Sequence, residues 1–252
     1  MLKKILKGLG VLIIIFVAVV LISLFFAQKA PPPLLVANFT NLDKIEKISK
    51  YRSCAGHVTV PQDGRETKRN MKHYYWVKPE YYGADTVEIY APFDGFVTVL
   101  RDEPALDLEG EIGIVPKDMF VWLPPLYRWS FSVQHIYVRD DLRQGSEVKA
   151  GELIGYAASD ANNRLGGSFD IVYAKFGLPL KNIDNWTAPF ADLDSVFNHM
   201  SDEVFAEYAE KGITSKEDFI LSKEERDQNP CQYQGEGPYF MDQEAEENWV
   251  KF

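Results

Sequence analysis

The chain has few of the side chains that bind metal ions, and basic residues are in the minority. Its 252 residues include only two cysteines and four histidines, with 27 Lys and Arg against 37 Asp and Glu. Any imidazole-based metal site must therefore use His57, His73, His135 or His199. Nucleic-acid binding requires clustered Lys and Arg, so a chain with net charge −10 is not expected to bind nucleic acid.

The negative charge is concentrated near the C-terminus. Residues 194–252 carry 15 acidic and five basic side chains, which accounts for the whole net charge of −10. Charge runs of this kind usually form solvated helical faces. The composition therefore predicts an exposed acidic C-terminal region, suited to an extracytoplasmic surface.

An uncharged apolar run covers residues 8–27 and is long enough to cross a bilayer as a helix. Lys3, Lys4 and Lys7 precede it, and basic residues stay on the cytoplasmic side, so the N-terminus is expected inside and the rest outside. A cleaved signal peptide is the alternative, although this run is longer than the usual signal core and no clear cleavage site follows. No cysteine follows directly, which disfavours a lipoprotein anchor.

The two cysteines are expected to pair. Outside the cytoplasm an oxidising compartment favours disulfides, which predicts a Cys54–Cys231 bond. The alternative uses Cys54 and His57 as metal ligands, but these are only two of the groups that a zinc site needs.

Short runs rich in β-branched and aromatic residues predict a mainly β fold, a β-barrel or sandwich. They are separated by Gly, Asp and Pro and cover 87–90, 96–100, 111–115, 130–138, 152–157 and 168–174. After residue 189 the spacing becomes helical over 196–208, with Gly212 as the expected cap. Capping-box spacing predicts further short helices from Thr214 and from Ser222.

Two glycine turns carry a resemblance to a known family. The first is Ala91-Pro92-Phe93-Asp94-Gly95, and the second runs without a gap from Gly145 through Val148 and Gly151 to Ile154-Gly155. As a pair they resemble the lysostaphin-type (LytM-like) zinc endopeptidases, which cut peptidoglycan cross-bridges, over about residues 72–176. The resemblance implies their β fold, a duplicated hybrid motif.

The metal ligands that the resemblance implies are mostly replaced. The family's His-x-x-x-Asp motif is best matched by His73, with Val77 in place of Asp. His135 matches the histidine of the middle strand. The final His-x-His-Phe-Glu-Val strand aligns with Phe169-Asp170-Ile171, which puts Gly166 and Ser168 at the histidine positions. No metal is therefore expected.

Three residues leave an alternative open. Zinc hydrolysis needs three protein ligands and an open coordination position. Ser168 and Asp170 share one face of a strand, so a rebuilt zinc site from His73, His135 and Asp170 is conceivable. Strand alternation otherwise puts His135 on the face of Phe131 and Val133, as a histidine left in a cleft, with Asp170 pairing locally and His199 structural.

Aromatic residues supply candidates for a binding groove. Tyr74, Trp76, Tyr81 and Trp129 could form the floor of a groove for sugars or extended peptides, or could be ordinary core residues.

Lipoyl-type barrels and the barrels of membrane-fusion adaptors share such turns. Adaptors insert heptad helices between the two turns and lipoyl barrels need a lysine on a tight hairpin. The interval between Gly95 and Val148 shows strands and prolines instead, which favours the peptidase-like topology.

The sequence thus predicts four parts: a cytoplasmic tip and transmembrane anchor (1–29), a linker (30–50), a lysostaphin-type-like β domain (51–190) and a helical acidic extension packed on it (191–252). The expected protein is a single-pass, membrane-anchored module that is inactive in catalysis and binds or regulates at the cell envelope, with cell-wall polymer or an envelope protein as its partner. The alternative is an active zinc-dependent peptidoglycan endopeptidase, and a purely structural role is the third hypothesis.

Overall fold

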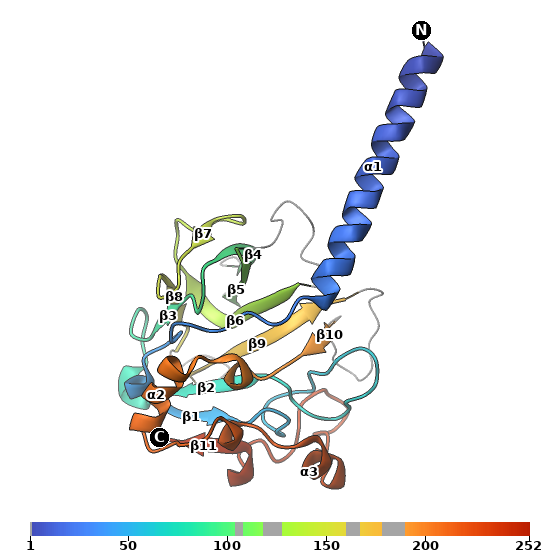
Figure 1. The fold of residues 1–252 in the computed structure, drawn as a ribbon. Coiled ribbons are helices and arrows are strands. Elements are labelled where there is room, and N and C mark those ends of the chain that lie inside the picture. The colour runs from blue at the N-terminus through green and yellow to red at the C-terminus, as the bar shows by residue number, and fades with distance from the viewer. Residues whose placement is uncertain (1, 104–107, 118–127, 160–166, 178–189) are drawn as a thin grey trace.

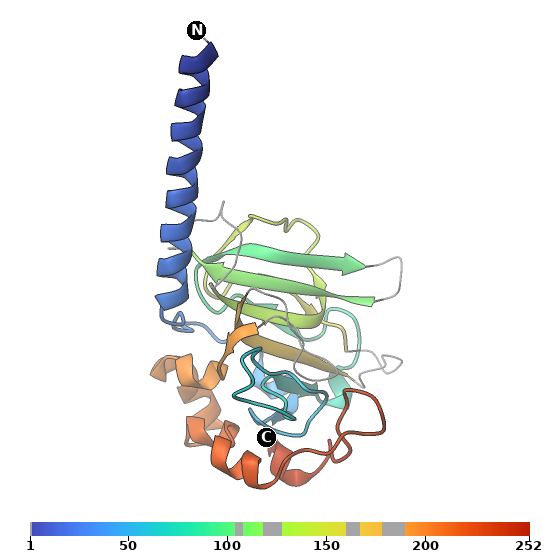
Figure 2. The same ribbon diagram turned by 90° about the vertical axis from the view of Figure 1, so that its right-hand side faces the viewer.

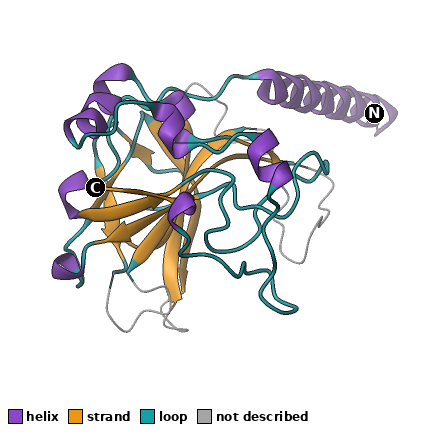
Figure 3. Cartoon of the chain, turned by 90° about the horizontal axis from the view of Figure 1, so that it is seen from below, coloured by secondary structure: helices purple, strands orange, loops and turns teal. Residues whose placement is uncertain are grey.

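The computed structural model describes residues 2–103, 108–117, 128–159, 167–177 and 190–252. One long helix, α1 (Leu2–Lys29), projects from a β-rich body, and short helices lie at the end of the body farthest from the N-terminus (Figures 1 and 2). Viewed from below, the strands gather at the centre with loops and short helices around them (Figure 3).

The described strands form one antiparallel sheet, which confirms the mainly β fold. The main path runs β11–β1–β2–β9–β6–β5–β4–β7, while β10 pairs with β9, and β8 pairs with both β3 and β6. The strands are β1 (Ile45–Ser49), β2 (His73–Val77), β3 (Glu88–Tyr90), β4 (Gly95–Glu103), β5 (Leu108–Pro116), β6 (Trp129–Val138), β7 (Glu147–Val148), β8 (Leu153–Ala157), β9 (Ser168–Phe176), β10 (Phe190–Leu193) and β11 (Trp249–Lys251).

The short helices include two α-helices and several 3₁₀ turns. They are η1 (Leu42–Lys44), η2 (Pro79–Tyr81), η4 (Val196–His199), α2 (Asp202–Glu210), η5 (Lys216–Phe219), α3 (Lys223–Gln228) and η6 (Glu246–Asn248). The continuous helix predicted over 196–208 is wrong, because Met200 is extended and forms a parallel bridge with Leu35. Ser195 and Ser201 each cap a separate helix on either side of this break.

The other capping predictions have mixed outcomes. Ser222 and Glu225 form the predicted capping box of α3. The next 3₁₀ turn begins one residue later than expected, because Ser215 and not Thr214 accepts the hydrogen bond from Glu217 N–H. Gly212 follows α2 with φ of +88°, a left-handed conformation suited to glycine.

Alternation along β9 separates two buried layers. Phe169, Ile171 and Tyr173 point into the main core, while Val172 and Ala174 point into a second, smaller core. The second core contains the Cys54–Cys231 disulfide, which confirms the predicted bond. Both faces of the central strand are therefore covered, and Asp170, fully buried, lies on the same face as Val172 and Ala174.

The predicted linker of residues 30–50 is too long. Leu35 and Phe39 are fully buried in the main core, and β1 pairs with both β2 and β11. β10 and β11 likewise join the sheet from the part predicted as a helical extension. The apolar residues of these segments complete the sheet and its core, which a boundary drawn from composition did not detect.

The C-terminal end of α1 contacts the β body. Lys175 donates to the Gln28 carbonyl (2.9 Å), and the Tyr173 hydroxyl donates to the Pro33 carbonyl (2.5 Å). Residues 7–29 are long and apolar enough to span a membrane.

Candidate functional site

A buried lysine is the centre of the main polar cluster. Lys72 Nζ donates to Gln134 Oε1 at 2.7 Å and to Asp170 Oδ2 at 3.0 Å, and it lies 3.3 Å from His57 Nε2. His135 Nε2 lies 3.9 Å from the same Asp170 oxygen. We call these five side chains the Lys72 cluster.

The sheet and one loop bring the cluster together. Across the strands, Asp170 of β9 pairs with Tyr74 of β2 and with Gln134 of β6. Just before β2, the Asn70 side chain accepts from Lys72 N–H (2.9 Å) and donates to its carbonyl (3.1 Å). These bonds fix the backbone that directs Lys72 towards Asp170.

His135 departs from the predicted strand alternation. It has φ of +64°, and the β5–β6 register shifts at this point, with Gln134 and Ile136 opposite the consecutive residues Glu111 and Gly110. Ile136 takes the buried core position, while His135 is partly exposed and approaches Asp170. The prediction that His135 shares the face of Phe131 and Val133 is therefore wrong, because the bulge turns it to the other face.

His57 is held as a neutral imidazole with one nitrogen facing Lys72. Its Nδ1–H donates to the Val58 carbonyl (3.0 Å), so Nε2 is left to accept from the lysine. Burial lowers the pKa of His57 to about 3, helped by the positive charge of Lys72.

Asp170 is ionised despite complete burial. Burial by itself raises the pKa of a carboxyl group, but the charge of Lys72 and its hydrogen bond outweigh it, so the Asp170 pKa is lowered. Asp170 Oδ1 is buried and has no hydrogen-bond partner among the described residues.

His73 is not part of this cluster. It faces the main core, where its Nδ1–H donates to the Ser49 carbonyl (2.7 Å) and its Nε2 accepts from the Ser195 hydroxyl (2.9 Å). Burial lowers its pKa to about 4. The structure therefore does not bring His73 together with His135 and Asp170, because His73 pairs with Ile171 and points to the opposite side of the sheet from Asp170.

The other positions named by the family motif fall in separate places. Ser168 is buried on the Asp170 face, where it pairs with Trp76, and Val77 is in the main core. Gly166 lies outside the described residues. His199 is paired with Asp194 (2.8 Å), in keeping with a structural role.

The four groove candidates do not form one surface. Tyr74 and Trp76 lie on the Asp170 face with Trp249. Tyr81 in η2 packs against the main core instead. Trp129 is buried in the main core, stacked on Tyr173 at 5.2 Å between ring centroids.

Tyr74 and Trp76 belong to a different aromatic cluster, in which Tyr74 and Trp249 are buried and Trp76 is partly exposed. The Trp76 and Trp249 rings meet edge to face at 6.0 Å, with Lys47 Nζ within 4.7 Å of both ring centres. His57 contacts Tyr239, which is 45% exposed. We call Tyr74, Trp76, Tyr239 and Trp249 the aromatic patch.

The C-terminal segment 229–245 lies next to the Lys72 cluster. Beyond the disulfide, Val58 N–H donates to the Pro238 carbonyl and Phe240 N–H to the Gly56 carbonyl, both at 3.0 Å. This pairing places Tyr239 against His57. The segment therefore supplies one side of the aromatic patch and covers part of the Asp170 face.

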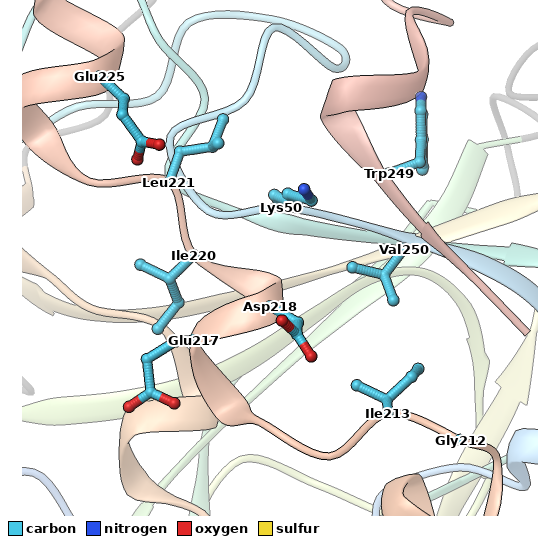
Figure 4. Close-up of a pocket in the computed structure, with 10 residues that line it drawn as sticks. All are labelled: Lys50, Gly212, Ile213, Glu217, Asp218, Ile220, Leu221, Glu225, Trp249 and Val250. Carbon is cyan, nitrogen blue, oxygen red and sulfur yellow. The ribbon is translucent and has the colours of Figure 1, made fainter.

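An open hollow of about 450 Å³ lies at another edge of the molecule (Figure 4). Glu217 and Asp218 come from η5, Val250 from β11, and Lys50 follows β1. None of the Lys72 cluster lines this hollow. Its carboxylates and aliphatic side chains do not form a nucleophile or a set of zinc ligands.

The described residues do not fit the zinc ion that the sequence resemblance implies. As these side chains stand, no group of three or more His, Cys, Asp or Glu among the described residues could hold a metal ion. Zinc ligands lie about 2.0–2.2 Å from the ion, whereas the groups around Lys72 Nζ lie at 2.7–3.3 Å, the distances of hydrogen bonds to an ammonium group. The ammonium group of Lys72 already occupies the position between these groups where a metal ion would lie.

The sequence did not identify Lys72 or Gln134 as site residues, and it considered His57 only with Cys54. The family's His-x-x-x-Asp motif, with its spacing of four residues, could have indicated Lys72. Lys72 and Trp76 have this spacing and lie on the Asp170 face, whereas His73 and Val77 have the same spacing on the core face. The register of β2 against β9, which the sequence does not display, decides between the two pairs.

No protein-family model matches the chain, and no curated protein matches its sequence. Among solved structures, Helicobacter pylori Csd3 matches with 17% identity over 57% of this chain and 30% of that one, with a TM-score of 0.35. A zinc-containing peptidase from Vibrio cholerae has 14% identity over 56% and 37%, with a TM-score of 0.35. Lysostaphin has 14% identity over 53% and 50%, with a TM-score of 0.32.

This chain therefore spans half or less of the length of each of these three proteins. One of the three matched structures is lysostaphin, after which the family that the turns at 91–95 and 145–155 resemble is named.

Proposed function

We propose that this protein is a membrane-anchored, extracytoplasmic module of peptidase-like fold that binds cell-wall peptides without cutting them. The observation that carries the proposal is the salt bridge between Lys72 and Asp170, both buried, inside a ring of acceptors. A zinc hydrolase needs an open coordination position that holds and activates water. An ammonium group bonded to the carboxylate supplies no such position.

Binding would use the aromatic patch. Trp and Tyr offer large apolar surfaces with polar edges, which suit sugars and extended peptides. Lys47 lies over both tryptophan rings, and the exposed Tyr239 continues the surface beside the Lys72 cluster. The ring surface open to a ligand is therefore that of Trp76 and Tyr239, because Tyr74 and Trp249 are buried and Lys47 is paired with Glu244.

The location at the envelope is part of the same proposal. The apolar helix α1 follows three lysines, which favours an N-terminus inside the cell. The Cys54–Cys231 disulfide is in keeping with an oxidising compartment for the β body.

Co-sedimentation of the detergent-solubilised full chain with purified peptidoglycan tests binding. We expect the wild type to sediment with the polymer, Tyr239→Ala to bind several-fold more weakly, and Tyr137→Ala to bind like wild type. Tyr137 is a matched control, because it is also 45% exposed but lies on β6 outside the patch.

The same samples are assayed for released peptides after incubation with zinc. We expect no release. Zinc-dependent release would contradict the proposal and favour an active endopeptidase, and absence of binding in every preparation would favour a protein partner or a structural role.

A further inference from the structure

The Lys72 cluster is arranged like a cation-binding site in which the cation is the ammonium group of Lys72 itself. Asp170 and Gln134 direct oxygens at Lys72 Nζ, and His57 directs a ring nitrogen at it. His135 approaches the same Asp170 oxygen from β6. One imidazole, a carboxylate oxygen and an amide oxygen therefore contact one positive charge, and a second imidazole lies beside the carboxylate. Imidazole and carboxylate groups are common zinc ligands.

The orientation of His57 supports this interpretation. Metal-binding histidines usually donate the second ring N–H to a carbonyl or carboxylate, which leaves the other nitrogen free to coordinate. His57 does this through Val58, with Nε2 facing the centre of the cluster. Asp170 Oδ1, buried and without a hydrogen-bond partner among the described residues, is a second acceptor in the same place.

We propose that Lys72 is an internal replacement for a metal ion, and that His57, His135 and Asp170 form a latent divalent-cation site that Lys72 blocks. This inference deepens the proposed function, on which it rests, by explaining why the domain would not hydrolyse peptides. Removal of the ammonium leaves a buried carboxylate without its counter-charge, which a divalent cation can restore. His57 and Asp170 would have to move inward by about 1 Å, from hydrogen-bond to coordination distances.

The test is metal binding by the full chain in detergent, measured by elemental analysis after dialysis and by the visible absorption of bound Co²⁺. We expect wild type and Lys72→Arg, which both keep a cation, to bind no stoichiometric metal. Lys72→Ala should gain one equivalent of Zn²⁺ or Co²⁺ and show a higher Tm when the metal is present. The double variants Lys72→Ala/His57→Ala and Lys72→Ala/Asp170→Asn should lose this gain.

If Lys72→Ala does not fold, the measurement is made on Lys72→Gln, whose amide can still donate to Asp170. A folded Lys72→Ala or Lys72→Gln variant that binds no metal would overturn the inference. Stoichiometric zinc in the wild type that depends on His57 would overturn it too. Peptide release and co-sedimentation of the wild type test the proposed function separately, so gain of metal by Lys72→Ala together with no polymer binding would contradict only the latter.

Discussion

At the scale of single residues, Lys72 and Asp170 determine the character of the site. Their side chains are only 6% and 1% exposed, so neither charge is solvated by bulk water. Removing one partner of a buried ion pair costs about 3–5 kcal/mol, whereas replacing both by apolar groups is often close to neutral. The pair should therefore behave as a unit.

Lys72→Met is expected to lower the free energy of unfolding by about 3–5 kcal/mol, because Asp170 loses its counter-charge. Lys72→Met/Asp170→Leu should recover most of this loss. Urea unfolding at pH 7 without metal measures both variants. A double variant less stable than the single one would show that the two residues contribute independently.

A second residue-scale prediction concerns pH. The pKa of His73 is about 4 in the folded protein against 6.5 in the unfolded chain, so the unfolded chain binds the extra proton first. The stabilisation is complete above pH 6.5 and is lost as the pH falls towards 4. At 1.36 kcal/mol per pKa unit its full size is roughly 3 kcal/mol.

His73→Gln should therefore lose less stability than wild type between pH 7 and pH 4.5, as measured by urea unfolding. His57 shifts in the same direction but is present in both proteins, so the difference reports His73. Equal losses in the two proteins would contradict a neutral, buried His73.

At the scale of elements, the two glycine turns could be identified from the sequence because backbone geometry demands glycine there. Gly145 and Gly151 have φ of +88° and +77°. Gly95 and Gly155 have no room for a side chain, since a Cβ would lie 2.5 Å from the Val115 carbonyl oxygen and 2.4 Å from that of Tyr137.

This difference predicts two kinds of substitution effect. Gly145→Ala should cost about 1–2 kcal/mol for its left-handed backbone, and Gly145→Asn should cost less, because Asn tolerates that conformation. Gly155→Ala should cost about 1–3 kcal/mol from overpacking, and Gly155→Asn at least as much. Urea unfolding of the four variants checks this, and rescue of position 155 by Asn would contradict the steric account.

All six strands predicted from residue runs are present, since alternation and β-branched residues mark a buried sheet. β1, β2, β7, β10 and β11 were not predicted, because their own patterns are short and most of their partners lie far away in sequence. The face of His135 could not be predicted, because a bulge reverses alternation without leaving a clear sequence signal. The site was therefore only half predictable: Asp170 and His135 could be named, but not Lys72 at their centre.

At the scale of the whole molecule, the disulfide joins two ends of the β body that are 177 residues apart. Closing so long a loop stabilises the fold by up to about 5 kcal/mol in the chain-entropy model. Cys54→Ser/Cys231→Ser should therefore lower Tm markedly and loosen segment 229–245. Thermal unfolding, with proteolysis of that segment as a second readout, measures the effect, and an unchanged Tm would contradict it.

The second prediction at this scale concerns the membrane orientation proposed for α1. If α1 crosses the membrane in the proposed orientation, protease added to intact cells with a permeable outer surface should digest the β body and leave the N-terminal lysines protected. Epitope tags at the two ends report the outcome. Protection of the C-terminal tag until the membrane is lysed would reverse the proposed orientation.

The most direct test of the central claim is a crystal structure of the wild type grown with zinc, with diffraction data measured at the zinc absorption edge. The account predicts Lys72 Nζ between Asp170 and Gln134, and no anomalous peak among His57, His135 and Asp170. A zinc peak at that position, with Lys72 displaced, would contradict the account and restore the case for a metallopeptidase.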